Sequence, residues 1–355
     1  MGQKVSRTDF EWVYTDEPHA TRRKEILKKY PEIKKLMGYD ASLKYIALIM
    51  MLFQFTACFF VKDFSWPVVF VLAYFIGGSI NHSLTLAIHE ISHNLAFGNA
   101  HPWKNRFFEI FVNLPIMIPY SAAFKKYHMD HHRYQGDDQL DLDIPSLLET
   151  RLFANTFTKL IWLFLQPLFY ALRPILTRPK PLTLLEAVNL CSQLSFDVLL
   201  YHYLGAKPVF YLLGGALMAM GIHPMAGHFI SEHYMFAKGY ETYSYYGVLN
   251  KVTFNVGYHM EHHDFPSVPG SKLHLVRAIA KEYYEDLPCH TSWCKVLYDF
   301  VFDPDIGPFA RIKRPSILDQ EGHDSKQNCC PKKEKCEDGP NGLPPIGNGD
   351  IFKSQ

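Results

Sequence analysis

Residues 65–93 read SWPVVFVLAYFIGGSINHSLTLAIHEISH, an apolar run that ends in a pair of histidines. From Ser65 to His89 the run contains no acidic residue, lysine or arginine. About 20 such residues are enough for a helix to cross a hydrocarbon core of about 30 Å. Because His89 and His93 are four residues apart, both imidazoles lie on one face of that helix. The stretch therefore predicts a transmembrane helix that ends in two side chains able to bind metal.

A second uncharged run lies directly before the first, from Tyr45 to Val61, and a link of a few residues around Lys62 joins the two. Such a short link predicts a helical hairpin. The preceding residues, 1–44, are rich in lysine and arginine. Because cytosolic flanks of spanning helices contain an excess of basic residues, segment 1–44 is predicted to lie in the cytosol.

Two further apolar runs, residues 184–204 and 208–231, are joined by a tight turn and predict a second hairpin. Residues 107–122 are apolar but short, and prolines interrupt them, which is typical of an interfacial or re-entrant segment. Residues 152–172 are also apolar but contain Lys159. We expect this last segment to lie along the membrane interface.

Two more histidine clusters follow, HMDHH at residues 128–132 and HMEHH at residues 259–263. On a helix, this spacing places two histidines on one face with a third beside them. The three clusters supply more histidines than the four ligands of one structural zinc ion, so two metal ions are the simplest explanation. Redox iron explains better than zinc why the site adjoins apolar helices. The candidate ligands are His89, His93, His128, His131, His132, His259, His262 and His263.

The positions of the clusters constrain the number of membrane crossings. The clusters can form one site only if an even number of crossings separates them. The two hairpins satisfy this condition if residues 152–172 do not cross. The sequence therefore predicts an all-α integral membrane protein with about four transmembrane helices in two hairpins and a cytosolic histidine-rich di-iron cap, formed by residues 45–314.

Two other histidines follow the last apolar run, in the sequence GHFISEHY at residues 227–234. We predict His233 as a further metal ligand and take His228 as another candidate. For His82, deeper in its span, a hydrogen bond between helices is the favoured role. Carboxylates within the clusters are predicted to accept a ring N–H and so fix the orientation of the ligands. These carboxylates are Glu90, Asp130 and Glu261, with Asp264 as a further candidate.

The overall composition excludes some functions and predicts two terminal features. A net charge of +1 gives no electrostatic basis for binding nucleic acid. The 7 cysteines have no regular spacing and do not predict a disulfide framework. Residues 315–355 are rich in glycine, proline, asparagine and lysine, and are predicted to be a disordered tail. The first residues, MGQKVS, match the pattern for N-myristoylation of Gly2.

Taken together, these sequence motifs resemble those of the membrane fatty-acyl desaturase and hydroxylase superfamily. The closest resemblance is to the sphingolipid Δ4-desaturases and their bifunctional C4-hydroxylase relatives. It extends over residues 1–315 and rests on the three clusters, on GHFISEHY, and on DFEWVY at residues 9–14.

The resemblance implies a di-iron centre made by the three clusters, with His233 at an extra ligand position and O2 as co-substrate. It implies dihydroceramide as substrate and residence in the endoplasmic reticulum membrane, where both termini are expected in the cytosol. It also implies electrons from NADH through cytochrome b5 reductase and cytochrome b5. Because the haem-binding motif HPGG of a fused cytochrome b5 does not occur in the sequence, the donor is expected to be a separate protein. Members of the family are N-myristoylated, which supports the expectation for Gly2.

Two outcomes of the implied reaction are open. Loss of hydrogens from C4 and C5 gives ceramide with a trans C4–C5 double bond, which is the leading prediction. Transfer of a hydroxyl group to C4, alone or as a second activity, gives phytoceramide. In the bifunctional relatives, a segment X-Ala-Phe-Gly-Tyr after the first cluster is linked to hydroxylation. Here the segment is Leu95, Ala96, Phe97, Gly98 and Asn99, and its final asparagine counts against hydroxylation.

The sequence is compatible with other functions. Within the enzyme class, a plain hydroxylase or an acyl-CoA desaturase is the alternative. Outside it, a histidine-rich membrane protein can handle zinc. A transporter should place its ligands midway along the spans. The clusters lie instead at span ends and in polar segments, which counts against transport.

Overall fold

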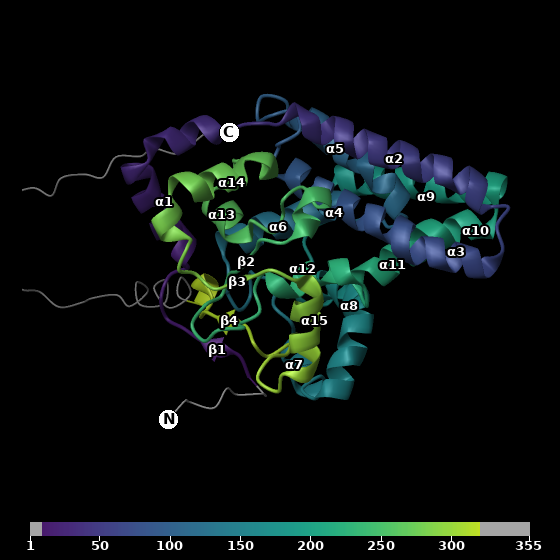
Figure 1. Cartoon of the computed structure of the whole chain (residues 1–355). Coiled ribbons are helices and arrows are strands. Elements are labelled where there is room, and N and C mark those ends of the chain that lie inside the picture. Colours follow the sequence, from purple (N-terminus) through teal and green to yellow (C-terminus); the bar gives the residue numbers. More distant parts are fainter. Residues whose placement is uncertain (1–8, 320–355) are drawn as a thin grey trace, which may run out of the picture. The chain divides into compact units, whose positions relative to one another are not determined.

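The computed structural model describes residues 9–319. The predicted myristoylation at Gly2 and most of the predicted disordered tail lie outside these residues. Among the described residues, those up to Ser316 form one compact unit. The unit is mostly helical, and it divides into a set of long helices and a region in which shorter helices hold the histidines (Figure 1).

The first hairpin begins with α2 (Ala41–Val61), whose N-terminus is capped by the Asp40 carboxylate accepting from the backbone of Ser42. Its second arm is α3 (Trp66–Leu72), which continues through a π-helical turn, η2 (Ala73–Gly77), into α4 (Gly78–Ser92). The two arms correspond to the apolar runs at 45–61 and 65–89.

The second hairpin begins with α9 (Leu184–Leu204) and continues in α10 (Ala206–Val209), the π-helical turn η4 (Phe210–Gly214) and α11 (Gly215–Met220). The apolar run 208–231 is not one helix. After Gly221 the chain bends by 46° into a 3-10 turn, η5 (Pro224–Ala226), and α12 (Gly227–Ser231). Proline at the start of η5 has no N–H to continue the earlier helix, which explains the break.

The two hairpins contact each other through glycines. A Cβ atom on Gly78 would lie 2.6 Å from the backbone oxygen of Gly215, and one on Gly215 would lie 2.7 Å from that of Ala73. Each glycine directly follows a π-helical turn, so the same local geometry occurs at the crossing point of both arms. Small residues therefore allow the backbones of α4 and α11 to approach closely.

Helices α5 (Pro102–Asn113) and α6 (Ser121–Arg133) are separated by a 3-10 turn, η3 (Leu114–Ile116), and are bent by 113°. A bend of this size is compatible with a re-entrant segment. Helix α8 (Thr156–Thr177) follows α7 (Leu147–Leu152) and contacts α15 (Trp293–Phe302) and α11. Its buried side includes Lys159 and Arg173, whereas its exposed side is lined by leucines and phenylalanines.

Among the described residues, α2, the combined arm α3–α4 and α8 are long and apolar enough to cross a membrane. Two bent pairs, α5–α6 and α10–α12, raise the possible number of crossings from 3 to 5. Helix α9 is not among them, because Asn189, Gln193 and Asp197 reduce its mean hydropathy. The chain is therefore a mostly helical membrane protein, and the arrangement of four crossings in two hairpins stays a prediction.

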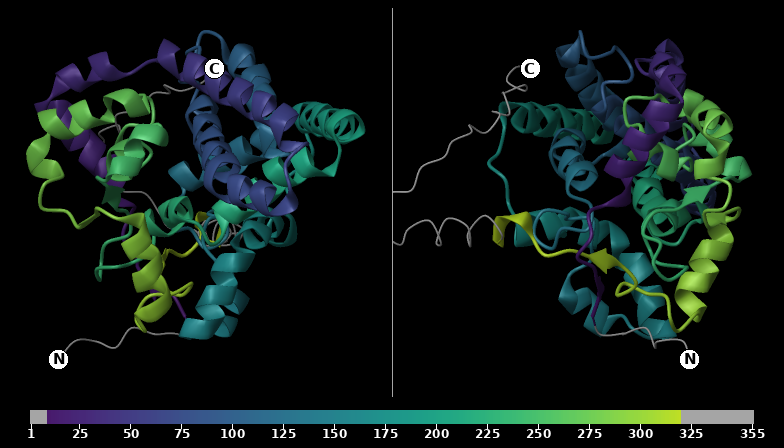
Figure 2. Two further views of the ribbon diagram at one scale, coloured as in Figure 1. Left: turned by 45° about the vertical axis from the view of Figure 1, so that its right-hand side comes forward. Right: turned by 90° about the vertical axis from the view of Figure 1, so that its left-hand side faces the viewer.

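The remaining elements lie in the region of the shorter helices (Figure 1). Two pairs of short parallel strands join distant segments, β1 (Glu11–Trp12) with β4 (Ile312–Lys313), and β2 (Ser244–Tyr245) with β3 (Cys289–His290). The purple N-terminal and yellow C-terminal parts of the described chain meet at the first pair (Figure 2). The helical elements are α1 (Pro18–Lys29), η1 (Pro31–Leu36), η6 (Val248–Val252), α13 (His259–Asp264), α14 (Gly270–Ile279) and η7 (Lys281–Tyr283).

Candidate metal centre

Nine histidines converge from the ends of α4 and α6, from α13 and from the turn after α12. They form two groups, and within each group one ring nitrogen of every histidine lies within 4.8 Å of the others. The first group comprises His89, His93, His128, His132 and His262, and the second comprises His131, His233, His259 and His263. The structure thus brings together all the cluster histidines and His233.

In the first group, two ring nitrogens lie at hydrogen-bond distance from more than one other ring nitrogen. The Nε2 atom of His128 lies 2.9 Å from that of His93 and 3.0 Å from that of His132. The same His132 atom lies 3.1 Å from Nε2 of His262. Each Nε2 atom has either one hydrogen or one lone pair, so it cannot make two hydrogen bonds at once. A cation among these nitrogens would satisfy all of them.

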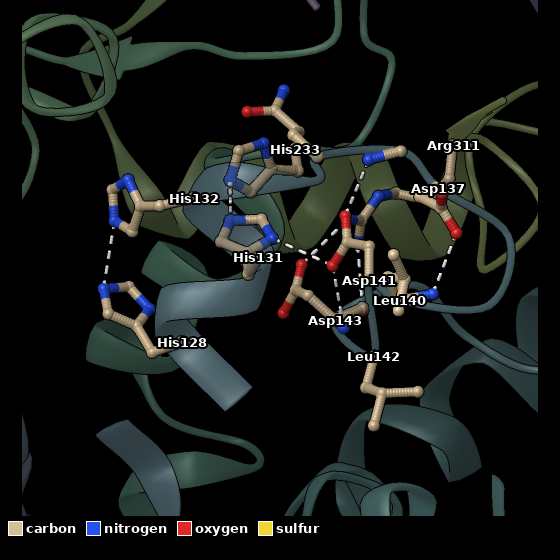
Figure 3. A network of polar contacts seen from close by, with 12 residues as sticks. His128, His131, His132, Asp137, Leu140, Asp141, Leu142, Asp143, His233 and Arg311 are labelled. Carbon is tan, nitrogen blue, oxygen red and sulfur yellow. Dashed lines mark hydrogen bonds and ion pairs between the residues drawn. The ribbon is translucent and has the colours of Figure 1, made fainter. Parts of the chain in front are cut away.

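The second group has the same property. The Nε2 atom of His233 lies 3.0 Å from that of His131 and 2.8 Å from that of His259 (Figure 3 shows the first of these contacts). The Nε2 atom of His263 is buried and has no hydrogen-bond partner. The rings of His263 and His132 stack with centroids 4.2 Å apart, so the two groups are direct neighbours.

The spacing of the nitrogens distinguishes between metal geometries. With metal–nitrogen bonds of about 2.0–2.1 Å, ligands at right angles are about 3.0 Å apart, and tetrahedral ligands are about 3.4 Å apart. The contacts of 2.8–3.1 Å fit the first arrangement. Seven of the nine histidines make these contacts, and the five histidines of the first group exceed the four ligands of a closed zinc site.

The protonation of the groups also suits a metal. Burial, followed by repulsion from neighbouring imidazoles, lowers the pKa of His128 and of His132 well below the usual range. These rings are therefore neutral, and their lone pairs are available. His131 differs, because its pKa is raised: burial would lower it, but the carboxylate of Asp141 outweighs that effect.

Asp141 fixes the orientation of His131. Its Oδ1 atom lies 2.9 Å from Nδ1 of that ring, so the other nitrogen, Nε2, is turned toward His233 (Figure 3). Asp141 is held in turn by the backbone N–H of Gly136, which donates to Oδ2 at 2.8 Å. The neighbouring Asp143 pairs with Arg311 at 2.8 Å. Motif spacing did not identify Asp141, although a run of aspartates follows the second cluster.

His233 also has an acceptor at its outer nitrogen. Its Nδ1 atom donates to the backbone oxygen of Glu241 at 3.1 Å. Nδ1 of His259 lies 3.4 Å from Oε1 of Glu232 but makes no hydrogen bond. Such acceptors fix the tautomer of a metal-bound imidazole and raise its basicity.

The carboxylates inside the clusters have other partners, which corrects the expectation for them. Glu90 is 3.7 Å from Nδ1 of His89 but accepts from the backbone N–H of Gly270 at 2.8 Å. Asp130 pairs with Lys180. Glu261 accepts from the hydroxyls of Ser244 and Tyr246, at 2.6 and 2.7 Å. On a helix, residues one or two positions from a ligand point to a different face, and these carboxylates therefore face neighbouring segments.

His228 lies in neither histidine group. Its Nδ1 atom is 2.8 Å from Nε2 of His82, and Nδ1 of His82 is 3.1 Å from the backbone oxygen of Ala219. The expectation of a packing hydrogen bond for His82 is confirmed. The possible ligand role of His228 is corrected, because its contact with His82 places it two turns along α4 from the first cluster.

Residues 95–99 form a tight turn after the first cluster. Asn94 and Gly98 have positive φ angles, of 63° and 78°. The side chain of Asn105 holds the turn by accepting from the backbone of Phe97 and donating to the backbone oxygen of Gly98. Asn99, at the position that departs from the bifunctional pattern, accepts from the side chain of Asn94 at 2.9 Å.

Comparison with known proteins gives two family matches. The model of the fatty acid desaturase family matches residues 64–293. The model described as Sphingolipid Delta4-desaturase (DES) matches residues 6–42.

Several curated proteins are similar over most of the chain. The sphingolipid delta(4)-desaturase DES1 of Drosophila melanogaster is 63% identical over 88% of this chain and 98% of its own length. DES1 of Homo sapiens is 59% identical over 88% of this chain and 97% of its own. The sphingolipid delta(4)-desaturase/C4-monooxygenase DES2 of Bos taurus is 58% identical, with the same coverage.

Proposed function

The chain belongs to the sphingolipid delta(4)-desaturases of the fatty acid desaturase family, and we propose on this basis that it introduces a trans C4–C5 double bond into dihydroceramide. The observation that supports this most directly is the pair of histidine groups, whose nitrogens cannot satisfy one another by hydrogen bonds. The chain is an oxidoreductase that acts on a sphingolipid, the lipid class in the names of its relatives.

We propose that the two groups hold two iron ions, one each. When bound, the iron pair supplies the O2-dependent oxidation that removes hydrogen from an unactivated methylene group. The histidines of the second group are all buried, so the chain keeps water away from this part of the site. Asp141 holds the ring of His131 in a single orientation, and preorganised ligands position the substrate carbon reproducibly.

We further propose that electrons come from NADH through cytochrome b5 reductase and cytochrome b5, and that the enzyme resides in the endoplasmic reticulum membrane with both termini in the cytosol. Myristoylation of Gly2 belongs to the same proposal, because the N-terminal sequence has the required pattern.

C4-hydroxylation is a second candidate activity. It is favoured by the 58% identity to a relative whose name includes C4-monooxygenase as well as desaturase. Residues 95–99, next to the first cluster, end in asparagine, so desaturation is proposed as the main activity.

Expression in yeast that lacks its own sphingoid C4-hydroxylase, followed by mass spectrometry of ceramides, tests the proposal. Sphingosine-type ceramide is the expected main product, and phytoceramide would show hydroxylation. If neither product forms while the protein is expressed and cytochrome b5 is active, the proposed function is wrong.

A further inference from the structure

The N-terminal segment is fastened to the elements that hold the metal-binding histidines. Its helix α1 begins after Glu17, whose side chain accepts from the backbone N–H groups of His19 and Ala20. This cap places His19 in the first turn of α1, where its side chain is only 4% exposed. Sequence spacing alone assigns His19 no role.

A chain of hydrogen bonds passes through the His19 ring. The side-chain amide of Gln135 donates to Oγ1 of Thr242 at 2.9 Å. The Thr242 hydroxyl therefore has its proton free for Nε2 of His19, 3.0 Å away. Nδ1 of His19 donates to Oδ1 of Asp264 at 2.7 Å. Both ring nitrogens of His19 therefore have partners, and Nη2 of Arg22 also lies 3.0 Å from Nδ1.

The residues of this hydrogen-bond chain that lie beyond His19 are each close in sequence to a metal-binding segment. Gln135 follows the second cluster, at the end of α6. Thr242 follows Glu241, whose backbone oxygen accepts from His233. Asp264 directly follows His263, and the His19 ring itself lies against the His263 ring with centroids 4.9 Å apart. One side chain therefore links three separate segments of the second histidine group.

Other contacts strengthen the same junction. Asp264 also accepts from Nε of Arg22 at 2.8 Å and from the hydroxyl of Tyr284 at 2.9 Å, although it is fully buried. Arg314, near the end of the described chain, donates to the backbone oxygens of Thr15 and Gln135, at 2.7 and 3.2 Å. The N-terminal segment is thus fastened before α1, at Thr15, and within α1, at His19 and Arg22.

The two family matches cover different parts of the chain, and the N-terminal segment falls in only one of them. The general fatty acid desaturase match begins at residue 64, whereas the sphingolipid Delta4-desaturase match covers residues 6–42. His19 and Arg22 lie in the second range. The part of the chain that distinguishes this family therefore contributes directly to the surroundings of the histidines.

We infer that His19 is a positioning residue of the second histidine group, and that residues 9–36 are a structural part of the metal centre. The inference rests on the proposed iron binding and adds that the second group holds its ion firmly only when His19 joins Asp264 to Thr242. Outer hydrogen bonds to a metal site change metal affinity by about 10–100-fold. A comparable loss is expected when the ring nitrogens of His19 are removed.

The test measures iron retention by the full-length protein purified in detergent. The variant His19→Phe keeps an aromatic ring but has neither nitrogen. Compared with wild type, it should lose iron at about 10–100-fold lower chelator concentration. The Mössbauer signal of one of the two iron sites should decrease before the other. His274→Phe, which changes an exposed histidine of α14, is the matched control and should behave as wild type.

A conservative variant separates positioning from simple folding. In His19→Gln the amide can donate to Asp264 and accept from Thr242, so iron retention should recover most of the difference. The iron-free forms of wild type and His19→Phe should melt at similar temperatures, whereas the iron-loaded forms should differ. If His19→Phe does not fold, Thr242→Val removes the hydroxyl that joins Nε2 of His19 to Gln135 and should weaken iron retention in the same direction.

Wild-type iron retention in His19→Phe would overturn the inference. So would a loss of melting temperature that is equal in the iron-free and iron-loaded forms, because the role of His19 would then be only in folding. A wild-type protein that binds no iron would overturn the proposed metal centre, and the inference with it.

Discussion

Among the predicted metal ligands, His131 has the best-defined surroundings. Nε2 contacts His233, Nδ1 contacts Asp141, and the ring is buried. Alanine at this position would remove both contacts. We expect His131→Ala to abolish the ceramide and phytoceramide products while the protein remains in the membrane.

Mass spectrometry of ceramides from membranes of the yeast strain above measures this effect, with immunoblotting to show equal amounts of protein. His274→Ala is the control, because His274 is exposed and lies outside both groups. Full activity of His131→Ala would remove the second cluster from the metal site.

Asp141 is expected to matter through the ring that it orients. In Asp141→Asn the amide can no longer hold the Nδ1 hydrogen of His131 as a carboxylate does, so metal affinity should fall by about 10–100-fold. Iron content after dialysis measures the fall. Asp138→Asn is the control, because Asp138 pairs only with Lys313 among the described ion pairs and is partly exposed. Equal iron content in the two variants would contradict the role of Asp141.

At the residue scale, spacing alone was enough to identify the histidines. Both HxxHH motifs lie on helices, and the ligands share faces as their spacing requires. The residues that orient the histidines could not be predicted in this way. Asp141 lies ten positions after His131, and His19 reaches Asp264 across the fold. Their roles depend on loop paths that local patterns do not determine.

Among the helices, the crossing of α4 and α11 is the most tightly constrained. A Cβ on Gly215 would meet backbone atoms of Ala73 and Gly78 at 2.7 and 2.8 Å, and backbone atoms cannot rotate away. We expect Gly215→Ala to destabilise the protein by about 1–3 kcal/mol. The melting temperature of the purified protein measures the change.

The adjacent Gly214 is a matched control for this prediction. A Cβ there would meet only the Phe210 side chain, at 3.1 Å, and that ring can move. Alanine also favours a helix over glycine by about 0.5–1 kcal/mol. Gly214→Ala should therefore melt at or above the wild-type temperature, and a loss equal to that of Gly215→Ala would contradict the crossing.

The long helices agree with the apolar runs to within a few residues, and α9 has the predicted limits, 184–204. The break after Gly221 and the two π-helical turns were not predicted. Hydropathy identifies apolar runs but does not record how the backbone curves within them. These irregular turns arise where α4 and α11 approach each other, which is a property of the packed pair.

For the whole molecule, we predict that α8 lies along the membrane interface. Both of its ends then face the cytosol, and the link between α2 and α3 faces the lumen. A glycan acceptor on a flexible insertion at that link should be modified in the endoplasmic reticulum. The same insertion before Thr156 or after Thr177 should not be. Glycosylation at only one end of α8 would show that it crosses.

The pairing of β1 with β4 has a consequence for biosynthesis. Trp12 leaves the ribosome about 300 residues before its partner Lys313. At about 5–20 residues per second, the interval is on the order of 15–60 s. For about the last 50 residues of this interval the nascent chain contains every histidine of both groups, but the segment bearing His19 has not been fastened by Arg314. The N-terminal strand can therefore join the fold only after both histidine groups have been synthesised.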